Sequence, residues 1–127
     1  DMRRAITLLQ SAYKRNGYGN SKKVSAKEIE ELAGIVPTSI ITDLVNKVGE
    51  KNVDAISEHV NDFMKSGWSA ASVINQLHQF YLISVDYNTK FKNKVSWILF
   101  DTDSKLSNGT NEHLQILNLL LQISQLL

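Results

Sequence analysis

The sequence predicts an all-α protein, and three observations support this fold class. Apolar residues recur every three or four positions along nearly all of the 127 residues, and no segment alternates apolar and polar residues as a half-buried strand does. The segments between these patterns contain glycine, asparagine and serine, which commonly end or begin helices. The only proline, Pro37, stands where a new helix would begin. We therefore expect seven helices, in a chain long enough to form a core.

The first helix begins the chain and is expected to end at the segment NGYGN (16–20). Its apolar side chains follow a single stripe at helical spacing. The members of this stripe are Met2, Ala5, Ile6, Leu9, Ala12 and Tyr13.

The second helix is short and has a clearly marked start. Ser25 and Glu28 have the spacing of a capping box, and Val24 with Ile29 has the spacing of the accompanying hydrophobic staple. Gly34 follows the last turn and suits a left-handed cap. Two helices of this size cannot bury their own apolar faces. We therefore place a domain boundary near residues 34–37 and treat 1–36 and 37–127 as separate parts.

Three further helices are expected in the middle of the chain. Pro37 opens one that ends at Gly49, Asn52 precedes the next, and Ser69 caps the third. Their inner faces are expected to hold Ile40, Ile41, Leu44, Val45, Val48, Val53, Ile56, Val60, Phe63, Met64, Val73, Ile74, Leu77, Phe80 and Tyr81.

The last two helices carry more apolar residues than one core requires. The sixth is expected from about Thr89 to Leu106, and within its segment VSWILF (95–100) apolar residues cover most of the circumference. The seventh follows the segment NGTN (108–111) and continues to Leu127. It has two apolar stripes, one of Leu114, Leu117 and Leu121 and the other of Ile116, Leu120, Ile123 and Leu127.

A helix that is apolar on two sides is buried on two sides. We interpret the second burial partner of these helices as another subunit, because a domain of this size rarely exposes so much apolar surface. The alternative is that each helix lies at the centre of its own chain's core. The residues expected at the interface are Trp97, Phe100, Leu114, Ile116, Leu117, Leu120, Leu121 and Ile123.

The charge is unevenly distributed along the chain. Residues 1–27 carry seven basic groups and one acidic group, a net charge of +6, whereas residues 28–127 carry seven basic and twelve acidic groups, a net charge of −5. Such asymmetry favours an anionic partner for the first segment. A solvated basic face with no ligand explains the charge equally well.

The sequence offers no catalytic residues and no metal site. It has no cysteine, which excludes a disulfide framework and a thiolate metal site, and its histidines (His59, His78 and His113) are too scattered for metal ligation. His78 is expected to be partly buried and hydrogen-bonded. No Ser/His/Asp set, carboxylate pair or Gly-rich phosphate loop can be assembled, and no apolar stretch is long enough to cross a bilayer. We expect no membrane partner.

Arg3 and Arg4 stand in the first turn of a helix, where cations are unfavourable by about 0.3–1 kcal/mol each. A phosphate at this helix start would make them favourable, because the helix dipole and the guanidinium group would then act together. Ion pairing with acidic residues elsewhere is the alternative.

Four segments resemble one family in sequence and order. DMRRAITLLQSA (1–12) resembles the sensor-2 helix in the small subunits of replication factor C, the eukaryotic clamp loader of the AAA+ ATPase class. ELAGIVP (31–37), FMKSGWSAASVINQLH (63–78) and LSNGTNEHLQILNLL (106–120) are similar to the same family. The resemblance covers essentially the whole chain.

The resemblance implies a role for each part of the chain. Residues 1–36 would be the end of an AAA+ lid, and residues 37–127 would be a collar domain that joins five subunits. Arg3 falls on the family's sensor-2 arginine, which contacts the γ-phosphate of the nucleotide. The resemblance assigns no role to Arg4.

The resemblance also implies what the parent protein does. It would be a nuclear protein that binds ATP and magnesium and, with the other replication factor C subunits, loads the PCNA sliding clamp on primer–template DNA in replication and repair. The family's phosphate-binding loop, metal-binding acids and trans-acting arginine precede the position matched by Asp1. We therefore expect this piece to bind no cofactor and to catalyse nothing by itself.

A second function class remains open from the residues alone. The basic N-terminal segment could make the chain an autonomous helical DNA-binding module. Such binding would weaken steeply as salt is added, because phosphate contacts release counterions. The net charge of −5 in residues 28–127 places this reading second.

Overall fold

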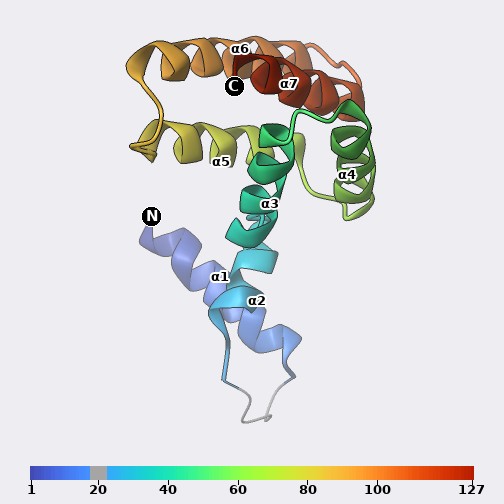
Figure 1. Ribbon diagram of the computed structural model, residues 1–127. Coiled ribbons are helices and arrows are strands. Elements are labelled where there is room, and N and C mark those ends of the chain that lie inside the picture. The colour runs from blue at the N-terminus through green and yellow to red at the C-terminus, as the bar shows by residue number, and fades with distance from the viewer. Residues whose placement is uncertain (18–22) are drawn as a thin grey trace. The chain divides into compact units, whose positions relative to one another are not determined.

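The computed structural model describes residues 1–17 and 23–127, and within them all regular secondary structure is α-helical (Figure 1). Seven helices follow one another along these residues, and no strand occurs among them. The all-α prediction is confirmed. Three residues of the expected turn NGYGN, together with Lys22, lie outside the described residues.

The chain divides into two compact units, Asp1–Pro37 and Thr38–Leu127. The first contains α1 (Met2–Arg15) and α2 (Ala26–Ala33). The second contains α3 (Thr38–Gly49), α4 (Val53–Lys65), α5 (Ala70–Ile83), α6 (Thr89–Ser107) and α7 (Glu112–Leu126). The division falls one residue after the boundary expected from the sequence.

The capping box of α2 forms as the sequence predicts. The Glu28 N–H donates to Ser25 Oγ at 3.3 Å, and the Ser25 N–H donates to Glu28 Oε2 at 3.0 Å. The hydrogen bond from the Ser25 backbone, followed by the one from Asn16, lowers the pKa of Glu28 below its ordinary value of 4.5. At the other end of α2, Gly34 adopts a left-handed conformation with φ +69°, which residues with a Cβ rarely adopt.

The apolar stripe of α1 is largely uncovered. α1 packs against α2, and an ion pair between Arg15 and Glu31 (3.5 Å) joins the two helices. Ala12 is buried, but the larger side chains of the stripe remain exposed because α2 has only eight residues: Met2, Ile6, Leu9 and Tyr13. This confirms that the two helices are too small to bury their apolar faces.

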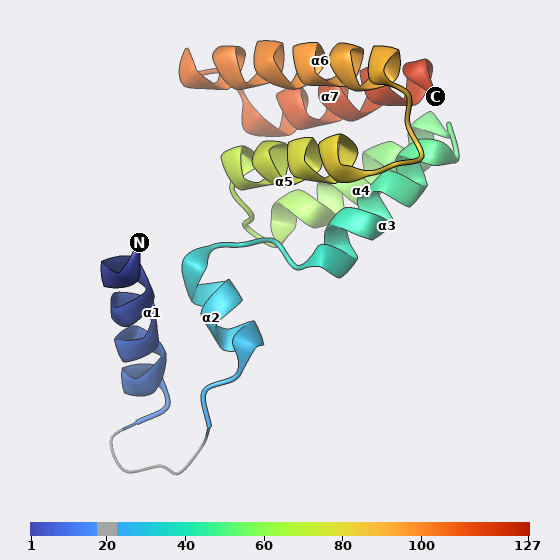
Figure 2. The ribbon, with the colours of Figure 1, turned by 90° about the vertical axis from the view of Figure 1, so that its left-hand side faces the viewer.

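The second unit is built around α7. This helix packs against α3, α4 and α6, while α5 packs against α3 and α6. Figures 1 and 2 both show α6 and α7 side by side. The core of this unit consists of Ile41, Leu44, Val45, Val48, Ile56, Val60, Phe63, Ala70, Val73, Ile74, Leu77, Tyr81, Val95, Leu99, Ile116, Leu119, Leu120 and Ile123.

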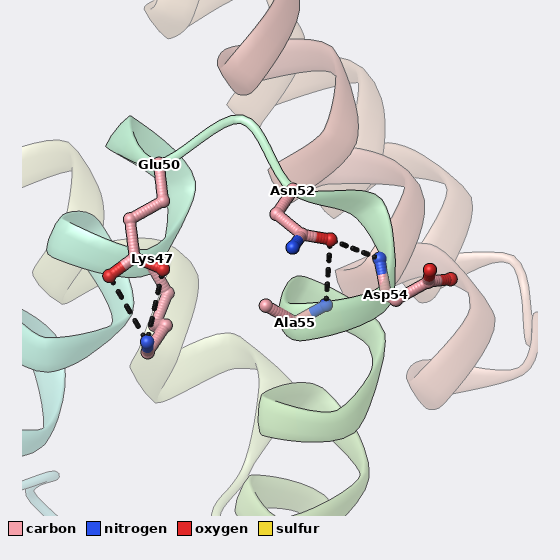
Figure 3. Close-up of polar contacts among 5 residues, drawn as sticks. All are labelled: Lys47, Glu50, Asn52, Asp54 and Ala55. Carbon is pink, nitrogen blue, oxygen red and sulfur yellow. Dashed lines mark hydrogen bonds and ion pairs between the residues drawn. The ribbon is translucent and has the colours of Figure 1, made fainter.

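Two separate sets of polar contacts lie at the connection between α3 and α4 (Figure 3). The Lys47 ammonium group donates to both carboxylate oxygens of Glu50, at 3.1 and 3.0 Å. Asn52 Oδ1 then accepts hydrogen bonds from the N–H groups of Asp54 (3.1 Å) and Ala55 (3.3 Å). Asn52 is therefore the N-cap of α4, which begins directly after Asn52 as expected from the sequence.

Some predicted core positions are wrong. Val53, the first residue of α4, is 59% exposed. Ile40, Met64 and Phe80 are only half-buried. Ser69 occupies the N-cap of α5 as expected, but its side chain makes no capping hydrogen bond.

None of the helices in the described residues combines the length and the apolar composition needed to span a bilayer.

Candidate interaction surface

α6 is held at its start by a cap and by an aromatic cluster. Asn88 Oδ1 accepts a hydrogen bond from the Phe91 N–H at 2.8 Å. The rings of Tyr87 and Phe91 stack with centroids 4.7 Å apart, and both lie within 6 Å of the Tyr81 ring. Burial of Tyr81 raises the pKa of its hydroxyl group above the ordinary value of 10.0. These contacts fix the direction in which α6 leaves the α5–α6 connection.

The outward face of α6 carries an exposed aromatic pair. Val95, Leu99 and Thr102 are buried on the inward side, so residues 97 and 100 point away from the core. Trp97 is 68% exposed and Phe100 is 64% exposed, with ring centroids 5.8 Å apart. The sequence prediction that these two side chains lie outside the core is confirmed; what covers them stays a prediction.

Two hollows flank Trp97. One, of about 430 Å³, lies at the seam between α6 and α7 and is lined in part by Lys94, Ile98 and Leu126. The other, of about 440 Å³, is lined by Asn93, Ser96, Trp97 and Phe100. The indole ring therefore lines both hollows, which side chains of a partner surface can fill.

The two apolar stripes of α7 have different environments. Leu114 is 62% exposed, and Leu117 and Leu121 are half-buried, so this stripe retains apolar surface that a partner could cover. The other stripe belongs to the core except at Leu127, which is 37% exposed. Three of its residues were predicted to contact a neighbouring subunit but are fully buried within this chain: Ile116, Leu120 and Ile123.

For these three residues the interface prediction is wrong. They are at most 1% exposed because α7 is enclosed by α3, α4 and α6 of its own chain, the arrangement that the sequence left open as the alternative. Leu119, which neither stripe included, is also fully buried. Because three helices pack against α7, residues on more than one side of this helix are buried.

A second exposed apolar cluster lies at the end of α5 and was not predicted. Leu82, Ile83 and Val85 are all exposed. A hollow of about 480 Å³ adjoins Ile83 and is lined in part by Ile41 and Phe80. The available signal was three large aliphatic residues within four positions at the end of a helix, which no single helical face can bury.

In the first unit, Arg3 and Arg4 are exposed. The Arg3 N–H donates to the Asp1 carboxylate at 3.1 Å, so an acidic cap does occupy this helix start. In residues 1–17 and 23–127, neither guanidinium group has an ion-pair partner.

Within the described ranges, no three His, Cys, Asp or Glu side chains come close enough together to hold a metal ion. His78 was expected to be partly buried but is exposed, because it lies one position beyond the buried stripe that contains Leu77. It lines a shallow hollow of about 180 Å³ with Phe100 and Asp103.

Comparison with known proteins gives one consistent result. Residues 36–122 match the family described as the Replication factor C C-terminal domain. The chain is 57% identical to Replication factor C subunit 2 of Saccharomyces cerevisiae, over 99% of this chain and 36% of the relative. It is 36% identical to the subunit of the same name in Schizosaccharomyces pombe, over 98% of this chain and 36% of the relative.

A human relative, Replication factor C subunit 4, is 31% identical over 98% of this chain and 33% of its own length. The chain therefore spans about a third of the length of the curated relatives that it matches.

Proposed function

The chain belongs to the replication factor C family, as its sequence segments predicted, and we propose that Thr38–Leu127 joins it to other subunits of a clamp loader. The observation that carries this proposal is the exposed pair Trp97 and Phe100. Burying one large apolar side chain stabilises a contact by about 1.5–3 kcal/mol. Two adjacent rings could therefore form the centre of an interface.

The surroundings of the pair support a protein partner. Asn93, Lys94 and Ser96 line the hollows on either side of Trp97, so polar groups surround an apolar centre. Interfaces between proteins commonly have this arrangement, with aromatic anchors at the centre and a polar rim. Leu114 adds apolar surface on α7.

Co-purification with the other replication factor C subunits tests the assembly role. In the full-length subunit, Trp97→Ala combined with Phe100→Ala should abolish or strongly weaken co-purification, because both anchors are lost. Val53→Ala, which truncates an exposed apolar side chain on α4, is the matched control and should have no effect. Undiminished co-purification of the double variant would remove the assembly claim for this surface.

We also propose that the parent protein acts in clamp loading. This rests on family membership: with ATP and magnesium, the assembled subunits would place the PCNA clamp on primer–template DNA in replication and repair, in the nucleus. Residues 1–127 alone would not hydrolyse ATP. An ATPase assay on this chain and on the assembled complex separates the two cases; hydrolysis by the chain alone would contradict the proposal.

Arg3 is proposed to sense the nucleotide from the lid. Its exposed guanidinium group has no ion-pair partner in the described part of the chain, and it stands at a helix start where an anion is favourable. In the full complex, Arg3→Ala should weaken ATP-dependent clamp loading without unfolding the subunit. Arg4→Ala, a neighbouring exposed arginine, is the matched control. Unchanged loading by Arg3→Ala would exclude the sensor role.

The alternative of an autonomous DNA-binding module has less support. Arg15, one of the basic residues of the first segment, already forms an ion pair with Glu31. Titration of this chain with duplex DNA at two salt concentrations tests the alternative directly. Binding at micromolar protein that weakens with salt would favour it, whereas no binding would favour assembly.

A further inference from the structure

The first half of α6 has an unusual charge pattern. Between Asp86 and Asp101 there is no acidic residue, but there are three lysines, and the first turn of α6 contains no acid. Cations near a helix start interact unfavourably with the helix dipole. The positions of Lys90 and Lys92 in the first turn therefore need an explanation, whereas Lys94 lies beyond that turn.

Lys92 has an internal explanation. Its ammonium group donates to the Leu82 carbonyl oxygen at 2.9 Å, near the end of α5, where a cation is favourable. Lys90 and Lys94 have none: both are exposed, and within residues 1–17 and 23–127 neither forms a hydrogen bond or an ion pair.

The two unpaired lysines lie on the same face as the aromatic pair. Lys90, Lys94 and Trp97 are spaced by four and three positions, so they follow one another along the outward side of α6. Lys94 also lines one of the hollows beside Trp97. We call the surface formed by Lys90, Lys94, Trp97 and Phe100 the α6 face. It has a cationic end and an aromatic centre.

We propose that the α6 face receives an acidic helical surface of a neighbouring subunit, whose carboxylates pair with Lys90 and Lys94 while its apolar residues cover Trp97. This inference rests on the proposed assembly function and adds the chemistry of the partner. Unpaired exposed lysines beside an apolar centre are satisfied by carboxylates at the rim of such a contact.

The second unit of this chain itself carries an acidic helical surface. On α4, three exposed carboxylates follow one another at intervals of four residues: Asp54, Glu58 and Asp62. α4 and α6 both pack against α7. The cationic face on α6 and the acidic face on α4 are therefore different parts of the second unit. A neighbouring subunit with a similar α4 could place its acidic face against the α6 face of this chain, a contact between two different surfaces.

A single-stranded nucleic acid is the competing occupant, because lysines beside an aromatic ring can also hold a phosphate backbone and a stacked base. The charge of the second unit favours a protein. Residues 38–127 contain nine acidic and seven basic residues, a net charge of −2, and Asp101 follows on the outward side of α6. A polyanion bound to this unit would meet its net negative charge, although the Asp101 carboxylate itself forms an ion pair with Lys105.

The test is a double charge reversal in the full-length subunit within its complex. Lys90→Glu with Lys94→Glu should weaken binding to the neighbouring subunits by about tenfold or more at low salt, because like charges then meet across the contact. The loss should shrink as salt is raised, since exposed charges are screened. Lys90→Arg with Lys94→Arg should retain binding. Lys23→Glu with Lys27→Glu, which changes the net charge equally in the first unit, is the matched control.

The outcomes separate this inference from the assembly proposal. If Trp97→Ala with Phe100→Ala abolishes binding while the charge reversal leaves it unchanged, the acidic partner is excluded and assembly through the α6 face stands. If neither pair of changes affects binding, both proposals fail. If the reversal instead lowers the affinity of the complex for an oligothymidylate, with subunit binding unchanged, the occupant is nucleic acid and the inference is overturned.

Discussion

α6 and α7 pack side by side in the second unit, yet they use their apolar residues differently. α7 is enclosed by three helices and buries Ile116, Leu119, Leu120 and Ile123. α6 contacts α5 and α7 on its inward side and leaves Trp97 and Phe100 in solvent. Apolar residues on two sides of a helix therefore indicate that both sides are buried. They do not indicate whether the same chain or another subunit buries each side.

The largest expected effect tests the central position of α7. Leu120→Ala should lower the free energy of unfolding by about 2–5 kcal/mol, because it leaves a cavity among α7 and its three neighbours. Leu114→Ala makes the same chemical change on the same helix at a 62% exposed position and should change stability by less than about 0.5 kcal/mol. Urea denaturation followed by circular dichroism measures both. Equal losses would contradict the difference between the two stripes.

A smaller effect is expected at the start of α6. Asn88→Ala removes the side chain that accepts the Phe91 N–H and should cost about 1 kcal/mol. Asn88→Ser, which keeps a capping oxygen, should recover most of the loss. The same denaturation experiment applies, and an Asn88→Ala variant as stable as the unmodified chain would show that the aromatic cluster alone holds α6 in place.

Trp97→Ala should hardly change the stability of the isolated chain. The side chain is 68% exposed, so its removal creates no cavity, and the change should stay within about 0.5 kcal/mol. Leu99→Ala, two positions away and buried, is the contrasting control and should be clearly destabilising. A large loss for Trp97→Ala in thermal or urea denaturation would place this ring in the chain's own core.

The smallest expected effect is a loss of helix capping at low pH, which should occur in α2 of the first unit but not in α6 or α7. The pKa of Glu28 is lowered by folding, so its contribution to the α2 cap is present above pH 4.5 and is lost as pH falls below that value. α6 and α7 are capped by Asn88 and Asn111, which do not titrate.

Amide hydrogen exchange should therefore show the Ser25 N–H losing protection below pH 4.5, after correction for intrinsic rates, while the Phe91 N–H keeps its protection. Glu28→Gln should remove the pH dependence. Loss of protection at both amides in the same pH range would mean that the whole chain responds to acid and not the α2 cap in particular.

Local features were predictable because they depend on residues close together in the sequence. The Ser25–Glu28 capping box, the left-handed Gly34 and the start of α4 directly after Asn52 are all present as expected. The expected sixth helix, Thr89 to Leu106, differs from α6 by one residue. The exposure of Trp97 followed from the number of apolar positions around the same helix.

The assignment of surfaces to core or exterior was less predictable. Val53 satisfies the helical spacing of α4 but is exposed, and the exposure of Ile83 at the end of α5 was not expected. Spacing defines which residues share a face, whereas burial depends on which distant segment covers that face. No pattern within one helix contains that information.

The sequence by itself determined the helices, the capping box of α2, the family and the surplus of apolar surface on α6 and α7, because periodicity, local capping and similarity depend on the order of residues along the chain. Only the tertiary structure decided that Leu120 belongs to the core while Trp97 faces outward. The physical reason is that α7 has helices on several sides and α6 does not, and this follows from how all five helices of the second unit pack together.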